Sequence, residues 1–156
     1  MMGNARNQKL IRHVNRKRWW HVPPQDAAAY SKRGKFFASS FSEAEFYGRP
    51  SDIPERVTIA RPLVGDERTI ARVLRIPPQR EGMSLEAIAG HDELWRNAAL
   101  AKGFDSIVLM SEEGFQKFEK EGKIPRSIEL NILDLRCLGT IRSQAPSQAT
   151  AYQFRK

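Results

Sequence analysis

The sequence predicts an α+β fold in which mixed central β-sheets are flanked by helices. Stretches typical of strands alternate with stretches typical of helices, but the strands come in unequal groups rather than in regular pairs with a helix. A chain of 156 residues with 40% hydrophobic residues can fill one core of modest size. No apolar run approaches the roughly 20 residues that span a bilayer. These observations favour a single domain without a membrane segment.

The first half of the chain is typical of short strands that alternate with short helices. Residues 1–16 show no convincing apolar period, and we expect them to fray. The expected elements are, in order, a strand over 18–24 (RWWHVPP), a helix over 26–33 (DAAAYSKR), a strand over 35–39 (KFFAS), a helix over 40–48 (SFSEAEFYG) and a strand over 55–64 (ERVTIARPLV). Proline ends the first strand because it removes a ladder donor, and glycine closes each helix. In the last strand, Val57 and Ile59 alternate toward the interior.

The second half combines longer helices with two strands. The expected elements are a helix over 65–76, a helix over 84–103, a buried strand over 104–110, a charged helix or loop over 112–123 and a strand region over 126–141. Apolar residues at helical spacing predict the buried faces of the first two helices. These residues are Ile70, Val73 and Leu74 in one helix and Leu85, Ile88, Leu94, Trp95, Ala98 and Leu100 in the other.

The net charge of +8 is concentrated at the two ends of the chain. Residues 1–18 carry six basic residues, residues 139–156 carry three, and neither end has an acid, whereas 17 basic and 18 acidic residues nearly cancel between them. We expect a basic N-terminal arm (1–17), one domain (18–142) and a flexible C-terminal tail (143–156). The basic ends are either solvated tails or contacts for nucleic acid or an acidic protein. No nucleic-acid-binding module accompanies them.

The cysteine and histidine pattern bears on the compartment and the cofactors. A single cysteine, Cys137, excludes an intrachain disulfide and is consistent with a reducing compartment. The basic N-terminus lacks the apolar stretch of a signal peptide, so we expect a cytoplasmic protein. The three histidines and the cysteine lack the spacing of zinc ligands, so we expect no metal site.

Three residues carry chemistry that their predicted positions do not fully explain. His21 follows two tryptophans on a strand, where a structural histidine is the ordinary alternative to a functional one. Tyr47 ends a helix and either packs there with a solvated hydroxyl or takes part in binding. Glu129 lies on a strand whose opposite face is apolar, so its carboxylate faces solvent, an ion-pair partner or a cleft. The residues of that apolar face are Ile128, Leu130 and Ile132, which leaves Glu129, Asn131 and Leu133 on the other.

In chain order, the segments WWHVP, GKFFASSFSEAEFYG and ELNILD resemble the three motif regions of the His-Tyr-Glu ADP-ribosyltransferases, the group of poly(ADP-ribose) polymerase and diphtheria toxin. In that family a first strand carries the histidine, a strand of the type Gly-Lys-aromatic-Phe-Ala leads into a helix that ends in the tyrosine, and a late strand carries the catalytic glutamate. His21, Tyr47 and Glu129 occupy these places. The segments VTIARPLVGDE and AKGFDSIVL also resemble small bacterial and phage members, so the similarity spans about residues 18–142.

The resemblance implies an ADP-ribosyltransferase-like fold and a mono-ADP-ribosyltransferase that uses NAD as its substrate and a macromolecule as its acceptor. Glu129 would stabilise the cation-like ribose that forms when the nicotinamide–ribose bond breaks. Tyr47 would stack on the nicotinamide, with Phe36 as a second aromatic, and His21 would bind the adenosine ribose. Host roles as a toxin, a phage effector or a regulator all fit the resemblance.

The chain departs from the family pattern directly after the histidine. The family has Gly-Ser or Gly-Thr there, whereas this chain has Val22 and Pro23. The valine backbone can still bind the nicotinamide amide, but its side chain narrows the approach, and proline offers no donor. Ser39 and Ser40 are expected either to line the pocket or to cap the helix that follows.

Two other functions fit the sequence. One is a catalytically inactive domain of the same fold that binds protein or nucleic acid through its basic arms. The other is a basic nucleic-acid-binding protein of unrelated fold, which would show salt-sensitive binding and no cleft near His21, Tyr47 and Glu129.

Overall fold

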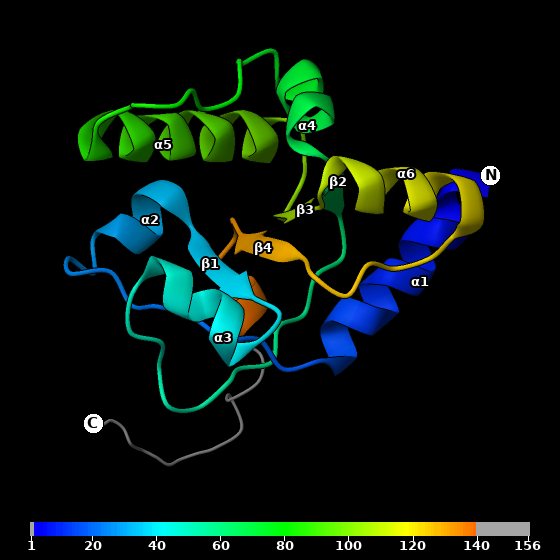
Figure 1. The fold of residues 1–156 in the computed structure, drawn as a ribbon, viewed down its shortest axis with the longest axis horizontal. Coiled ribbons are helices and arrows are strands. Elements are labelled where there is room, and N and C mark those ends of the chain that lie inside the picture. The colour runs from blue at the N-terminus through cyan, green and yellow to red at the C-terminus, as the bar shows by residue number, and fades with distance from the viewer. Residues whose placement is uncertain (1, 140–156) are drawn as a thin grey trace.

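The computed structural model describes residues 2–139 of the chain (Figure 1). The fold is α+β, with one four-stranded mixed sheet and flanking helices, which confirms the coarse fold class predicted from the sequence. The helices are α1 (Met2–Arg16), α2 (Ala29–Arg33), α3 (Phe41–Ala44), the 3₁₀ turn η1 (Glu45–Tyr47), α4 (Glu67–Leu74), α5 (Leu85–Ala101), α6 (Glu112–Glu121) and α7 (Arg136–Gly139). The strands are β1 (Lys35–Ala38), β2 (Pro62–Gly65), β3 (Ser106–Leu109) and β4 (Glu129–Ile132). The tail expected over 143–156 lies outside the described residues.

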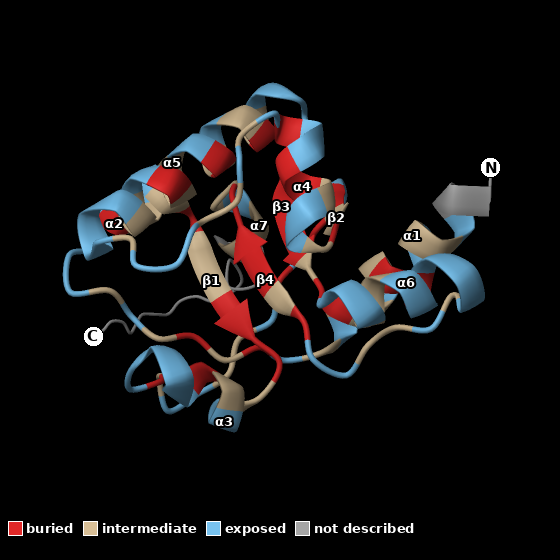
Figure 2. Ribbon diagram, turned by 45° about the horizontal axis from the view of Figure 1, so that its top comes forward, coloured by how far each residue is buried: buried red, intermediate tan, exposed pale blue. Residues whose placement is uncertain are grey.

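The sheet has the strand order β1-β4-β3-β2. Strand β4 runs antiparallel to both of its neighbours, β1 and β3, whereas β2 runs parallel to β3. The connection from β2 to β3 contains α4 and α5, because a parallel pair needs a crossover. Three of the four residues in each of β2, β3 and β4 are buried, and two of the four in β1 (Figure 2).

Alternation along β4 divides the interior into two layers, as the sequence predicted. Leu130 and Ile132 face α1 and α6 and pack there with Phe37 and Val108. The other face lies under α4 and α5, where Ile107 belongs to a second buried cluster. Successive side chains of a strand point to opposite sides, so Glu129 and Asn131 share this second face.

The N-terminal residues form a docked helix, so the expectation that they fray is wrong. Leu10 and Val14 of α1 are fully buried in the core, one helical turn apart. Asn15 fixes the end of α1: its Nδ2 donates to the carbonyl of Ile59 at 3.1 Å, and its Oδ1 accepts from the Ile59 N–H at 2.8 Å. Figures 1 and 2 show α1 beside α6. The few apolar residues of this basic segment therefore decide its structure.

Three predicted strand regions are shorter in the structure than in the sequence analysis. In the segment 18–24, only isolated bridges form, from Trp19 to Glu55 and from Trp20 to Ala38. The strand expected over 55–64 is reduced to β2, although Val57 and Ile59 are buried as predicted. Of the region expected over 126–141, the part that the structure describes (126–139) holds the four residues of β4 and then α7. In these regions, only the residues that form continuous hydrogen bonds with a neighbouring strand belong to the sheet.

The buried face of α5 matches the predicted stripe only in part, since Trp95 is buried as predicted. His91, Trp95 and Ala99 point inward at intervals of four residues, whereas Leu85 is 85% exposed and Leu94 is 56% exposed. On α4, Ile70 and Leu74 are buried as predicted but Val73 is exposed. The segment 112–123, left open as helix or loop, is the helix α6, which begins at the cap Ser111 and ends at Gly122. Within residues 2–139, no helix has the length and apolar character needed to cross a membrane.

Candidate functional site

A cavity of about 820 Å³ opens on the α5 side of the sheet, within the size range of small-molecule sites. Its floor is formed by side chains of β1, β3 and β4, namely Phe36, Ala38, Ile107, Leu109, Glu129 and Asn131. Helices α2 and α5 and the segment 20–25 supply the walls, and η1 supplies part of the rim. Figure 1 shows α2 and α5 on one side of β1 and α3 at its far end.

The cavity joins the tyrosine and the glutamate of the sequence motifs. The Tyr47 hydroxyl donates a hydrogen bond to Glu129 Oε2 at 3.2 Å, although 82 residues separate the two. Glu129 is the first residue of β4 and lies between Ala38 and Leu109 of the neighbouring strands. Its backbone position is therefore set from both sides by the sheet.

The turn that presents Tyr47 depends on its flanking residues. Ser40 caps α3 by accepting from the Glu43 N–H at 3.2 Å, and η1 follows α3 directly. Gly48 then has a φ of 139°. A Cβ on Gly48 would lie 2.9 Å from Cγ1 of Val22, so glycine allows the turn to close against the wall of the cavity.

The surroundings of Glu129 favour the protonated form of its carboxyl group more than water does. Burial raises the pKa of Glu129 most, and the negative charges of Asp92 and Glu67 raise it further, while the hydrogen bond from Tyr47 lowers it. The pKa of Tyr47 is raised to about 12, by burial first and then by Glu129. The Tyr47 side chain is 68% exposed as a whole, so the burial concerns the hydroxyl end beside Glu129. Tyr47 thus remains a hydrogen-bond donor at neutral pH.

His21 is buried and both of its ring nitrogens are occupied. Nδ1 lies 2.7 Å from the Phe36 carbonyl oxygen, and Nε2 lies 2.9 Å from the Tyr30 hydroxyl. A carbonyl can only accept, so Nδ1 carries the proton. Burial lowers the pKa of His21, which favours the neutral ring, and Nε2 then accepts from the Tyr30 O–H. Both ring nitrogens of His21 are therefore already hydrogen-bonded. The polar atom that this arrangement leaves available as an acceptor in the cavity is the Tyr30 hydroxyl oxygen.

The remaining predicted site residues divide into two groups. Val22 and Phe36 line the cavity together with His21, Tyr47 and Glu129. The two serines do not line it. Ser39 is buried, where its Oγ donates to the Ile128 carbonyl at 3.1 Å and accepts from the Ile128 N–H at 2.9 Å. Ser40 is the cap of α3, so the capping alternative holds for it.

Several residues that line the cavity were not predicted from the sequence as site residues. These are Tyr30 on α2, Glu67 on α4, His91, Asp92 and Trp95 on α5, and Asn131 on β4. Asn131 follows Glu129 by two positions, so strand alternation alone places the two on one face. On α5, Trp95 was expected on the buried face of the helix, but His91 and Asp92 gave no such signal, because their orientation depends on how the helix packs against the sheet.

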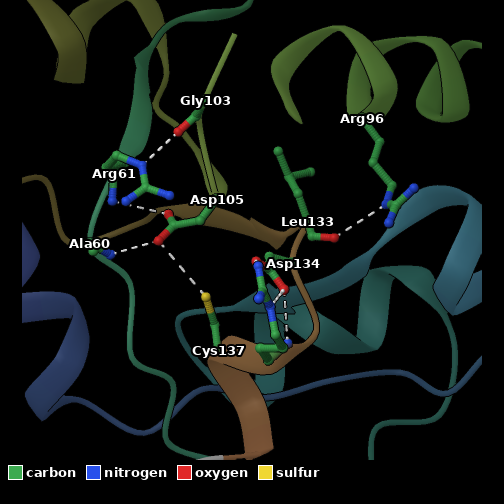
Figure 3. A network of polar contacts seen from close by, with 9 residues as sticks. Ala60, Arg61, Arg96, Gly103, Asp105, Leu133, Asp134 and Cys137 are labelled. Atoms are coloured by element: carbon green, nitrogen blue, oxygen red, sulfur yellow. Dashed lines mark hydrogen bonds and ion pairs between the residues drawn. The ribbon is translucent and has the colours of Figure 1, made fainter. Parts of the chain in front are cut away.

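A second polar network lies around Asp105 and has a structural role (Figure 3). The Asp105 carboxylate accepts from the backbone N–H groups of Ala60 and Arg61, at 2.8 and 3.2 Å, and from the Ser106 hydroxyl at 2.8 Å. The thiol of Cys137 donates to the same carboxylate at 3.8 Å. These bonds tie the segment before β2 to the start of β3 and to α7, on residues that do not line the cavity.

The cavity therefore offers three carboxylates, phenols, imidazoles and aromatic walls around a space that can hold a ligand. Among residues 2–139, no group of three or more His, Cys, Asp or Glu side chains is placed to hold a metal ion. Comparisons of the chain with protein-family models, with curated proteins and with solved structures found no match.

Proposed function

We propose that this chain is a mono-ADP-ribosyltransferase, with an ADP-ribosyltransferase-like fold, that cleaves NAD at the nicotinamide–ribose bond and transfers ADP-ribose to a macromolecule. The observation that carries the proposal is the meeting of His21, Tyr47 and Glu129 around one cavity. They come from three separate segments, and two of them are joined by a hydrogen bond. The alternative hypothesis of a nucleic-acid-binding protein of unrelated fold predicted no cleft at these residues, so the cavity speaks against it.

Glu129 supplies the electrostatic part of the reaction. When the bond between ribose C1″ and the nicotinamide nitrogen breaks, its electron pair leaves with nicotinamide and the ribose acquires positive charge. A carboxylate at the cavity floor stabilises that charge more than it stabilises the neutral sugar, which lowers the barrier. The acceptor then bonds to C1″ and loses one proton, for which the carboxylate is the nearest base.

The aromatic residues hold the dinucleotide for this step. Tyr47 stacks on the nicotinamide ring while its hydroxyl keeps Glu129 oriented, and Phe36 supplies a second apolar surface on the floor. His21 orients Tyr30, whose hydroxyl oxygen presents a hydrogen-bond acceptor to a ribose hydroxyl. The histidine would then act in positioning and not as a proton carrier.

A catalytically inactive domain of the same fold is the second candidate, and two observations favour it. Val22 and Pro23 line the cavity at the positions where the family has Gly-Ser or Gly-Thr. Valine is bulkier there, and proline has no N–H to donate to the nicotinamide amide. The surface of α1 also presents Lys9, Arg12 and Arg16 as exposed cations, which suit an acidic partner or nucleic acid.

Turnover of labelled NAD in the presence of cell lysate tests the proposal. The wild-type protein is expected to release nicotinamide and to label a target, and Glu129→Gln is expected to reduce both by about 100-fold or more. Glu119→Gln, an exposed position on α6, is the matched control and should leave the rate unchanged. If wild type and Glu129→Gln are equally inert while neutralising Lys9, Arg12 and Arg16 removes partner binding, the inactive-domain candidate replaces the enzyme.

A further inference from the structure

We propose that a set of exposed cations on and beside α1 binds the phosphate backbone of a nucleic-acid duplex. This basic face consists of Lys9, Arg12, Arg16, Arg18 and Arg56. Helix α1 packs on the side of the sheet that carries Leu130 and Ile132, whereas the cavity opens on the α5 side, and none of the five cations lines it. The basic face therefore lies apart from the steps assigned to Glu129, and duplex binding is a function additional to NAD cleavage.

Helix α1 presents three of the cations as a fixed row. Lys9, Arg12 and Arg16 follow one another at intervals of three and four residues, so they lie along one side of the helix. Leu10 and Val14 hold the opposite side in the core. At a rise of about 1.5 Å per residue, the row is roughly 10 Å long. A duplex carries one phosphate charge per about 1.7 Å of its axis, so each cation of the row can meet a phosphate while the helix stays in place.

The other two cations, Arg18 and Arg56, are placed opposite each other just beyond the end of α1. Trp19 and Glu55 form an antiparallel bridge in which each backbone N–H donates to the other's carbonyl, at 2.7 and 2.8 Å. In this register residue 18 faces residue 56, on the side away from the buried Trp19 ring. Both arginines are exposed. Like charges at facing positions repel each other, so an anion bound between them would be stabilising.

Among the residues that the structure describes, no carboxylate forms an ion pair with the basic face. The ion pairs found there join Lys35 to Glu55, Lys117 to Glu113 and Arg136 to Asp134. The segment 1–25 itself contains no Asp or Glu. Helix α6 beside α1 carries exposed acids, but Lys9 donates instead to the Gly122 carbonyl at the end of that helix, at 3.0 Å. An ammonium has three donors, so two of them remain for a phosphate.

The chemistry of the basic face favours a duplex over an acidic protein, a membrane or a single strand. Protein interfaces are centred on apolar or aromatic anchors, and membrane-surface helices insert an apolar face. Here Leu10 and Val14 are already buried in the core. Single strands bind by stacking their bases on aromatic rings, and the ring of Trp19 is fully buried. Cations alone suit a phosphate backbone, and the forked donors of arginine match its oxygens.

Binding of a fluorescent DNA duplex by the full chain, measured by anisotropy over a range of salt concentrations, tests the proposal. The logarithm of the affinity should fall linearly with the logarithm of the salt concentration, with a slope of about −4 to −5, because five cations displace counterions from the phosphates. A second duplex of unrelated sequence should bind equally well, since contacts to phosphate carry no sequence information. A single strand of the same length and a poly-glutamate peptide should both bind more weakly.

A matched pair of variants separates the basic face from general charge attraction. Arg12→Gln combined with Arg16→Gln removes two neighbouring phosphate contacts, so affinity at low salt should fall by about tenfold or more and the salt slope should become shallower by about 2. Arg72→Gln combined with Arg80→Gln removes the same charge from exposed positions in and after α4, on the other side of the sheet. This control should change neither the affinity nor the slope.

Histidine resonances in the nuclear magnetic resonance spectrum locate the bound duplex. His13 on α1 senses the charge of this surface: burial lowers its pKa most, and the charges of Lys17 and Arg16 lower it further. Its imidazole resonances should move when the duplex is added, whereas those of His91 in the cavity wall should stay in place. A shift confined to His91, equal weakening in the two double variants, or tighter binding of the single strand or of poly-glutamate would overturn the proposal.

The outcome is also separable from that of the proposed function. NAD turnover without duplex binding leaves the transferase and removes the basic face as a nucleic-acid site. Duplex binding that depends on Arg12 and Arg16, in a protein that does not turn over NAD, keeps the basic face and supports the inactive-domain candidate with nucleic acid as its partner.

Discussion

The hydroxyl of Tyr47 and the carboxylate of Glu129 lie 3.2 Å apart at the edge of a cavity floored by the sheet. One comes from the turn after α3 and the other from the first residue of the late strand β4. Their contact couples the protonation of the glutamate to the position of the tyrosine, because a hydrogen bond to the ionised form lowers the pKa of a carboxyl.

For the proposed NAD turnover, Tyr47→Phe is expected to move the acid limb of the pH profile to higher pH. The hydroxyl of Tyr47 stabilises the ionised form of Glu129, so its loss raises the pKa of Glu129 and the carboxylate is protonated at less acid pH. The rate at the optimum should fall on the order of tenfold. Turnover measured across the pH range checks the shift, and an unchanged acid limb would separate Tyr47 from the ionisation of Glu129.

Asp92→Asn is expected to move the same limb in the opposite direction. The negative charge of Asp92 raises the pKa of Glu129, so a neutral side chain at position 92 lowers it and extends turnover to more acid pH. Glu86→Gln on the same helix is the control. A shift toward higher pH in Asp92→Asn would contradict the electrostatic relation between the two carboxyl groups.

Tyr30→Phe is expected to raise the KM for NAD by about tenfold with little change in kcat. The change removes the oxygen that His21 orients toward the cavity, and it leaves the groups around Glu129 in place. Initial rates over a range of NAD concentrations separate the two constants. A lower KM would instead mean that the Tyr30 hydroxyl blocks His21 from the dinucleotide.

Ser39→Ala is expected to lower the free energy of unfolding by about 1–3 kcal/mol, because it leaves the buried N–H and carbonyl of Ile128 without their side-chain partner. Urea titration measures the effect. Ser42→Ala, at an exposed position on α3, is the control and should change stability little. NAD turnover of folded Ser39→Ala should match that of the wild type, and a selective loss of turnover would show that Ser39 has a role in the site.

Cys137 is expected to react slowly with thiol reagents in the native protein. Burial raises its pKa to about 12, and the charges of Asp105 and Asp134 act in the same direction. Because the thiolate is the reactive form, Asp134→Asn should lower the pKa and speed the reaction. The rate of colour release from a disulfide reagent measures this, with the denatured protein as the reference. A slower reaction in Asp134→Asn would contradict the assignment.

Much of the candidate site could be predicted from local patterns. Alternation in the last strand placed Glu129 opposite Leu130 and Ile132, and this holds in the structure because a strand has a period of two. The helix that ends at Tyr47 was visible from its serine cap and its closing glycine. Both features depend on only a few neighbouring residues.

Other parts depended on contacts that no local pattern contains. The basic N-terminal segment carries few apolar residues, yet Leu10 and Val14 become fully buried because the sheet offers a matching surface. The wall of the cavity presents His91 because α5 packs with a particular rotation. The stripe predicted from the sequence included Trp95, which is buried, but it also included Leu85 and Leu94, which are exposed.

The sequence by itself determined the α+β class, the order of the main elements and the face on which Glu129 lies, since these follow from periodicity, caps and breakers. Only the tertiary structure decided that Tyr47 forms a hydrogen bond to Glu129 and that the Tyr30 hydroxyl is hydrogen-bonded to Nε2 of His21. It also decided that Asp92 lines the same cavity. Contacts between distant segments depend on strand order and helix rotation, and these are fixed by the packing of the whole core.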